Sequence, residues 1–69
     1  MLDVGQKIKV ICADKAMTQK ELAKIHGDQY QVWNNKMHRN TMRFSEVEKI
    51  MDELNCDVVF IDRETRKVY

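Results

Sequence analysis

Residues 18–40, TQKELAKIHGDQYQVWNNKMHRN, carry the strongest indication of the fold of this chain. Thr18 and Glu21 have the spacing of a capping box, in which two side chains satisfy the free N–H groups at the start of a helix. Gly27 follows this first short helix, and a glycine readily takes the left-handed conformation that ends a helix in a tight turn. A further helix is predicted over residues 29–38. The stretch therefore predicts two helices joined by a tight turn.

The second of these helices is polar on the face that we expect to be exposed. It carries Gln31, Asn34 and Asn35 and no carboxylate. Asn is a poor helix former, so two in succession indicate that something other than helix stability selected them. Amide side chains can form a bidentate pair with N6 and N7 of adenine in the major groove. A polar helix that follows a short helix and a turn is typical of the helix-turn-helix, which places its second helix against DNA.

The distribution of charge supports contact with a polyanion. The 69 residues have a net charge of only +1. Residues 29–45, however, contain Lys36, Arg39 and Arg43 with no acid, which gives +3, and residues 46–69 contain seven acids and four bases, which gives −3. The positive charge thus lies on and just after the polar helix, as contact with DNA phosphates requires. A solvated face with an ordinary local imbalance of charge is the alternative interpretation.

Two further helices are predicted to complete a small core. One covers residues 4–15 with Asp3 as its N-cap, and the other follows a second capping-box pair, Ser45 and Glu48, and ends near Leu54. Their apolar residues recur at the spacing of one helix face. The expected core positions are Val4, Ile8, Ile11, Cys12, Leu22, Ala23, Val32 or Trp33, Met37, Phe44, Val47, Ile50, Met51 and Leu54.

The tail after the last helix changes character and predicts a small β-hairpin. Residues 58–61 are β-branched or aromatic, residues 62–66 are polar, and residues 68–69 can form a returning strand. A two-stranded ribbon leaves an open edge that a second copy of the chain can cover, so we expect a homodimer. A hairpin folded wholly onto its own helices is the alternative. The expected dimer contacts are Val58, Val59, Phe60, Ile61, Val68 and Tyr69.

The expected fold is mainly α with a small C-terminal β-hairpin, in a four-helix helix-turn-helix domain. Sixty-nine residues make one domain, with residues 1–55 helical and residues 56–69 in the hairpin. A chain this short buries only about 60% of its unfolded surface, so association with another subunit is a natural source of stability. No apolar run approaches the roughly 20 residues of a membrane span, and no signal peptide is recognisable, so we expect a cytoplasmic protein.

The sequence contains no pattern typical of catalysis or of a bound metal. Cys12, His26, His38 and Cys56 are scattered singly, whereas zinc ligands cluster at short spacing. The two cysteines are expected to be small apolar side chains in a reducing compartment. No nucleophile elbow or phosphate loop is present. We therefore expect no enzyme, no cofactor and no metal site.

Roughly residues 4–54 resemble the Cro/repressor-type (Xre-like) helix-turn-helix proteins of phages and bacterial regulators. The resemblance lies in TQKELAKIHG, in the polar helix that follows it, and in the later helix FSEVEKIMDEL. The resemblance suggests a phage or other mobile element as the source. Small members of that family often end in strands that pair across a dimer. The resemblance implies base contacts by Tyr30, Gln31, Asn34 and Asn35, and contacts with the DNA backbone by Thr18, Gln19, Lys36, Arg39, Asn40 and Arg43.

The chain departs from the family pattern where His26, Asp28 and Trp33 replace aliphatic residues. We expect Ile25 to compensate for the missing aliphatic side chains at the turn. We expect Asp28 to cap the next helix, which would keep its carboxylate from opposing DNA phosphates. Trp33 is expected to anchor the core rather than to intercalate between bases. His26 is expected to be a satisfied residue of the turn.

These features predict a sequence-specific regulator of transcription, most simply a repressor, that binds double-stranded DNA as a homodimer. Two recognition helices would enter successive major grooves about 34 Å apart. The alternative is a protein-interaction module on the same scaffold, such as an antirepressor, antitoxin or assembly factor. An exposed apolar patch that includes Trp33 or Met37 would indicate this alternative. RNA binding is a weaker third candidate, because no RNA-binding signature is present.

Overall fold

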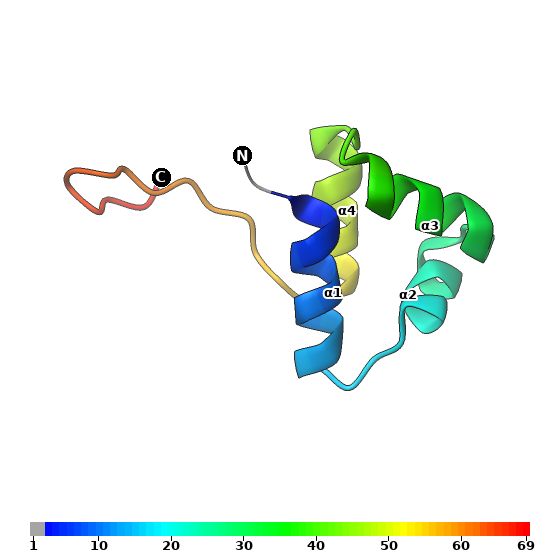
Figure 1. The fold of residues 1–69 in the computed structure, drawn as a ribbon. Coiled ribbons are helices and arrows are strands. Elements are labelled where there is room, and N and C mark those ends of the chain that lie inside the picture. Colours follow the sequence, from blue (N-terminus) through cyan, green and yellow to red (C-terminus); the bar gives the residue numbers. More distant parts are fainter. Residues whose placement is uncertain (1–2) are drawn as a thin grey trace.

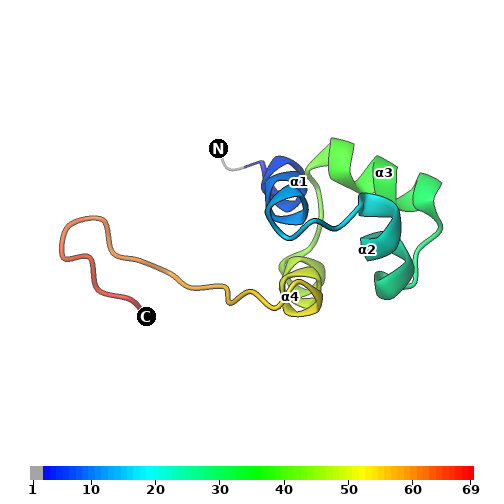
Figure 2. The ribbon, with the colours of Figure 1, turned by 90° about the horizontal axis from the view of Figure 1, so that it is seen from below.

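The computed structural model describes residues 3–69, which form four helices and an extended arm (Figure 1). The helices α2 and α3 lie on one side of α1 and α4, and the arm leaves on the opposite side (Figures 1 and 2). None of the helices in this part of the chain is long and apolar enough to cross a membrane. The four helices are α1 (Val4–Asp14), α2 (Gln19–His26), α3 (Tyr30–Arg39) and α4 (Phe44–Glu53).

Local hydrogen bonds set the start of the first two helices and the end of the second, as the sequence predicts. The Asp3 carboxylate accepts a hydrogen bond from the backbone N–H of Gln6 at 3.1 Å and begins α1. Thr18 and Glu21 form the complete capping box of α2. Gly27 ends α2 in the left-handed conformation, with φ of 91°. These contacts confirm the predicted caps.

Two other predicted caps are wrong. The N-caps of α3 and α4 are Gln29 and Arg43, and neither makes a side-chain cap hydrogen bond. Helix α4 begins at Phe44, so Ser45 lies inside the first turn and cannot act as the residue that precedes the helix. Asp28 forms an ion pair with Lys36 instead of capping α3. The ion pair with Lys36 thus takes the place of the predicted cap at the start of α3.

All four helices contribute to one apolar core. Trp33 is fully buried at its centre, which confirms its predicted role as the anchor of α3. The core does not include Phe44, whose side chain is 53% exposed and stacks on Phe60 with 6.1 Å between ring centroids. Ile25 is 58% exposed, so the prediction that it compensates at the turn is wrong. The core residues are Ile8, Cys12, Leu22, Ala23, Trp33, Met37, Ile50, Met51 and Leu54.

Helices α1 and α3 approach closely at a glycine. A Cβ added to Gly5 would overlap the backbone carbonyl of Met37, so a side chain at this position would push the two helices apart. Asn40 ends α3 with φ of 52°, and its side-chain oxygen accepts a hydrogen bond from the backbone N–H of Val4 at 3.1 Å. The start of α1 therefore holds the end of the polar helix in place.

The predicted C-terminal β-hairpin is not formed. In the described residues there is no strand, and the tail contains one isolated antiparallel bridge between Ile61 and Val68. A two-stranded ribbon without further cover is only marginally stable in water. The tail instead forms an arm that points away from the helices (Figures 1 and 2). The radius of gyration is 12.9 Å, whereas a compact chain of this length would have about 11 Å.

Candidate nucleic-acid interface

The exposed face of α3 carries the two amides that the sequence places against bases. Gln31 and Asn35 are one helical turn apart, and both are exposed, as is Arg39 one turn further on. The opposite face, with Trp33 and Met37, is buried in the core. Helix α3 is thus held by an apolar face and presents two amides and a guanidinium to solvent, with no carboxylate in its own sequence.

The other two predicted base contacts flank this face. Asn34 is half-buried, so it lies to one side of Gln31 and Asn35. The Tyr30 ring is exposed at the start of α3, where the ammonium of Lys20 lies 5.6 Å from its centroid. Lys20 was not among the predicted site residues. Its exposed place in the first turn of α2, beside the predicted contact Gln19, is the signal that identifies it.

Three of the predicted backbone contacts, Lys36, Arg39 and Arg43, line a hollow of about 400 Å³ beside α3, whereas Asn40 does not line it. Val32 also lines this hollow and is 45% exposed, so it is not the core anchor that the sequence left open as an option. An exposed apolar side chain beside amides suits contact with the methyl group of thymine. The lining residues are Val32, Asn35, Lys36, Arg39, Thr41, Met42, Arg43 and Glu46.

The start of α2 is fixed relative to α3. The Thr18 hydroxyl is engaged within its own helix turn, where it accepts from the Glu21 N–H at 3.1 Å. The Gln19 side-chain oxygen accepts a hydrogen bond from the indole N–H of Trp33 at 3.3 Å. The Gln19 amide nitrogen still carries two N–H donors that can reach a phosphate. This contact ties the predicted backbone residue Gln19 directly to the anchor of α3.

His26 joins α2 to α4 through two carboxylates. Its side chain is only 5% exposed, and its ring nitrogens lie 2.6 Å from Glu53 Oε1 and 3.0 Å from Glu46 Oε2. Each ring nitrogen of His26 thus faces one of the two carboxylates. The His26 ring also meets the edge of the Trp33 ring, with 5.5 Å between centroids. His26 is therefore satisfied, as predicted, but by contacts distant in the sequence.

Lys36 connects this arrangement to α3. Its ammonium lies 2.8 Å from Asp28 Oδ2 and 2.6 Å from Glu46 Oε2. Hydrogen bonds to Asp28 and Glu46 raise the pKa of Lys36 above its ordinary value. The hydrogen bond from Lys36 is the main reason that the pKa of Glu46 is lowered. We call the five residues His26, Asp28, Lys36, Glu46 and Glu53 the polar clamp.

The polar clamp changes the distribution of charge available to DNA. The Asp28 carboxylate is paired with a cation and does not stand unpaired before a phosphate. In return, part of the Lys36 charge is compensated by its own chain. Arg39 and Arg43 are exposed beside the hollow and make no ion pair with a described residue. These two arginines thus present uncompensated positive charge beside α3.

A family model for the Cro/C1-type helix-turn-helix DNA-binding domain matches residues 7–59 of the chain. The chain belongs to this family. The match confirms the resemblance seen in the sequence, and it makes the chain a DNA-binding domain of the type that regulators contain. No curated protein and no solved structure gave a significant match.

In this Cro/C1-type domain, the polar clamp also brings possible metal ligands together. Ligand atoms of His26, Asp28 and Glu46 lie within 4.8 Å of one another, although sequence spacing alone suggests no such cluster. The ammonium of Lys36 already contacts both carboxylates, so a cation from the chain itself lies among them. The cluster is thus accounted for by the ion pairs that join α2, the following turn, α3 and α4.

The cysteines lie outside the interface of the Cro/C1-type domain. Cys12 is buried in the core, where burial raises the pKa of its thiol, and Cys56 is half-buried beside the core. Both are free thiols. Cys12 is therefore the small buried side chain that the sequence predicts.

Proposed function

We propose that this Cro/C1-type domain is a sequence-specific regulator of transcription that reads double-stranded DNA with α3 in the major groove. The observation that carries the proposal is the exposed face of α3, where Gln31, Asn35 and Arg39 stand opposite the buried Trp33 and Met37. Repression follows most simply, because a protein bound across a promoter blocks access to it.

Each side chain at this face has a role in the proposal. Gln31 and Asn35 contact base edges, since amides pair with adenine in the major groove. Tyr30 and Asn34 contact the neighbouring bases from the flanks, and Val32 packs on a thymine methyl group. The remaining contacts are with phosphates and set the register of the protein on the duplex. They are made by Thr18, Gln19, Lys20, Lys36, Arg39, Asn40 and Arg43.

The burial of the large apolar residues of α3 favours DNA over a protein partner. A protein-interaction module would need an exposed apolar patch on this helix. Trp33 and Met37 are buried, and they were the residues whose exposure would have indicated such a module. Val32 and Tyr30 are the large apolar residues of α3 that remain exposed, and their neighbours along the helix are amide and basic side chains.

We further propose that the domain acts as a homodimer. Two copies related by a two-fold axis would place their α3 helices in successive major grooves about 34 Å apart and read a pseudo-palindrome. The exposed apolar residues of the arm support association, because a domain this small gains stability from it.

The test of the proposed function is selection from a random duplex library at physiological salt, followed by sequencing of the bound DNA. We expect a two-fold symmetric motif with half-sites one helical turn apart. A single asymmetric motif would retain base reading and exclude the dimeric mode. Weak, salt-sensitive binding without any motif would contradict sequence-specific regulation.

A further inference from the structure

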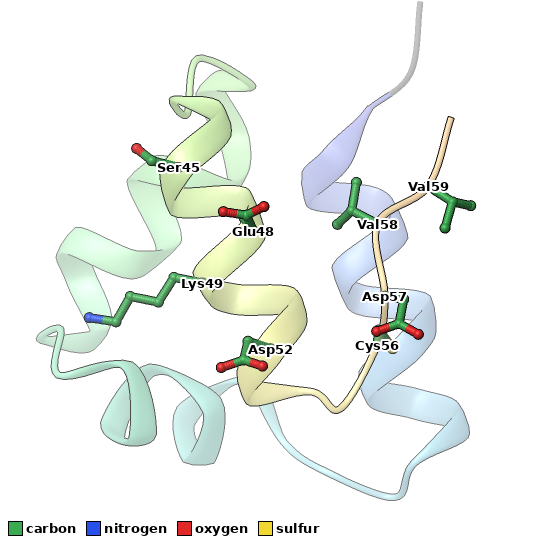
Figure 3. A pocket seen from close by; sticks show the side chains of 8 residues that line it. All are labelled: Ser45, Glu48, Lys49, Asp52, Cys56, Asp57, Val58 and Val59. Carbon is green, nitrogen blue, oxygen red and sulfur yellow. The ribbon is translucent and has the colours of Figure 1, made fainter. Parts of the chain in front are cut away.

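A groove runs between the outer face of α4 and the first residues of the arm (Figure 3). Helix α4 contributes one wall and residues 56–59 contribute the other. The groove contains three carboxylates, Glu48, Asp52 and Asp57, and one ammonium, Lys49, which gives a net charge of −2. None of the three carboxylates forms an ion pair with another described residue. We call this feature, with a volume of about 690 Å³, the acidic groove.

The tip of the arm carries the opposite charge. Residues 63–67 contain Arg63, Arg66 and Lys67 against Glu64, which gives a net charge of +2. This segment is ordered locally, because the Asp62 carboxylate accepts hydrogen bonds from the backbone N–H groups of the two residues that follow Arg63, at 2.8 Å and 3.0 Å. We call residues 63–67 the basic turn.

The arm cannot bring the basic turn into its own groove as it is folded. The arm starts in the wall of the acidic groove and continues away from the helices, and the basic turn lies at its far end in both views (Figures 1 and 2). Between the groove and the turn lie Phe60, which stacks on Phe44, and Ile61, and both are more than half exposed. Val58, Val59, Phe60 and Ile61 are between 37% and 64% exposed.

We propose that the acidic groove is the docking site for the basic turn of a second copy, so that two arms exchange across a two-fold axis. The inference rests on the homodimer of the proposed function and names its contact surface. The charges are opposite in sign: −2 in the groove, and +2 in the turn, or +1 when Asp62, whose carboxylate is hydrogen-bonded to the turn, is counted with it. The same contact then occurs twice, because a two-fold interface is made of identical patches on both copies.

The chain geometry is consistent with this contact. If the two 58–61 segments lie antiparallel with the axis between Val59 and Phe60, residue 63 of one copy lies opposite residue 56 of the other. Arg63 is then next to the partner's stretch of chain that lines the acidic groove, near Asp57 and Asp52. The same pairing covers the exposed apolar residues of both arms and supplies the partner that an isolated ribbon lacks.

Charge reversal on each side tests the proposal in the full chain without DNA. The variants are Arg63→Glu with Arg66→Glu on the turn, and Asp52→Lys with Asp57→Lys in the groove. Sedimentation equilibrium at low and high salt gives the dissociation constant of the dimer. We expect each pair of reversals to weaken the dimer by roughly tenfold or more, and salt to weaken the unmodified dimer. The matched control is Lys7→Glu with Lys15→Glu, which reverses two exposed bases at α1.

Mixing the two reversed variants tests whether the groove and the turn are in direct contact. Recovery of a dimer in the mixture, with each variant monomeric alone, supports direct contact between groove and turn. A chain that stays monomeric, a dimer indifferent to the reversals, or a mixture without recovery overturns the proposal. The DNA selection tests the proposed function separately. A monomer that still selects a motif contradicts only the docking surface. A dimer that forms as expected but selects no motif contradicts only the reading of DNA.

Discussion

At the scale of single residues, positions that pack the helices together differ from positions that are exposed on α3. Gly5 has no exposed chemistry, yet a methyl group there would overlap the carbonyl of Met37. Gln31 and Asn35 do nothing for the core, yet they form the exposed face of α3. Changes at the first kind should alter stability, and changes at the second kind should alter only recognition.

Gly5→Ala should destabilise the fold although alanine is the better helix former. The added methyl group meets backbone that cannot rotate away, so α1 and α3 must separate. We expect a loss of about 1–3 kcal/mol in the free energy of unfolding, measured by urea denaturation. The neighbouring exposed Gln6→Ala serves as control and should stay within about 0.5 kcal/mol. An unchanged stability for Gly5→Ala would contradict the close approach of the helices.

Gln31→Ala and Asn35→Ala should each weaken binding to the selected site by about 1–3 kcal/mol and leave non-specific binding almost unchanged. The reason is that, in the proposed complex, these two uncharged amides contact bases and not phosphates. The measurement is fluorescence anisotropy with the selected duplex and with a scrambled one. Gln6→Ala, an amide removed from α1, is the control. Equal losses on both duplexes would contradict base reading.

Arg39→Ala should behave differently, because in the proposed complex the guanidinium beside the α3 hollow binds phosphates. We expect weaker binding to every duplex and a reduction of about 1 in the slope of log K against log salt concentration. The same titration over a range of salt measures both. A loss confined to the selected duplex would place Arg39 on a base instead.

At the scale of elements, the polar clamp takes the place of the aliphatic contacts that the family usually has at the turn. It joins α2 through His26, the turn through Asp28, α3 through Lys36 and α4 through Glu46. Ion pairs of this kind are directional, so they define the angle between helices more narrowly than an apolar contact would. The polar clamp therefore acts on the placement of α3 together with the buried Trp33 and the hydrogen bond between Asn40 and Val4.

Glu46→Gln should lower stability at neutral pH by on the order of 1 kcal/mol. It should also remove part of the acid sensitivity. The pKa of Glu46 is lowered in the folded chain, so its contribution is present above the ordinary value of 4.5 and is lost as pH falls through the folded value. Urea denaturation between neutral and acid pH measures both effects. The exposed Glu48→Gln is the control, and an equally steep acid dependence in Glu46→Gln would refute the clamp.

At the scale of the whole molecule, the arm contacts the helices where Cys56 packs against the core and Phe60 stacks on Phe44. Its apolar residues are exposed, and its single bridge holds only the tip together. Two helix-turn-helix units joined through their arms can read two half-sites, and a single unit can read one. In the proposed dimer, affinity for the full operator therefore depends on the arm.

Val59→Asp should distinguish the binding of one half-site by a single domain from the binding of the full site by a dimer. In the proposed dimer, a carboxylate at position 59 lies near the two-fold axis and faces the same carboxylate of the second copy, so the dimer and the affinity for the full site should fall together. Affinity for an isolated half-site should stay unchanged, and the thermal stability of the helices should be retained, because Val59 is half-exposed. The control is Val10→Asp, a similarly exposed valine on α1. Loss of half-site binding in Val59→Asp would contradict a role limited to dimerisation.

Features that depend on neighbours a few residues away could be predicted from the amino-acid sequence alone. The caps at Asp3, Thr18 and Gly27 span one helical turn, and the apolar spacing that predicts Trp33 and Leu54 in the core is a property of single helices. The family resemblance, now confirmed, rests on the same local patterns. These caps and apolar patterns could be predicted because each is complete within one short segment.

The remaining features arise only when the helices pack together. His26 meets carboxylates 20 and 27 residues away, and that meeting exists only once α2 packs on α4. The Asp28 carboxylate pairs with Lys36 and does not cap the start of α3, so the predicted cap is wrong. The predicted hairpin failed because strands need cover that lies outside their own sequence. Contacts between distant segments depend on the packing of whole helices, and no local pattern encodes that packing.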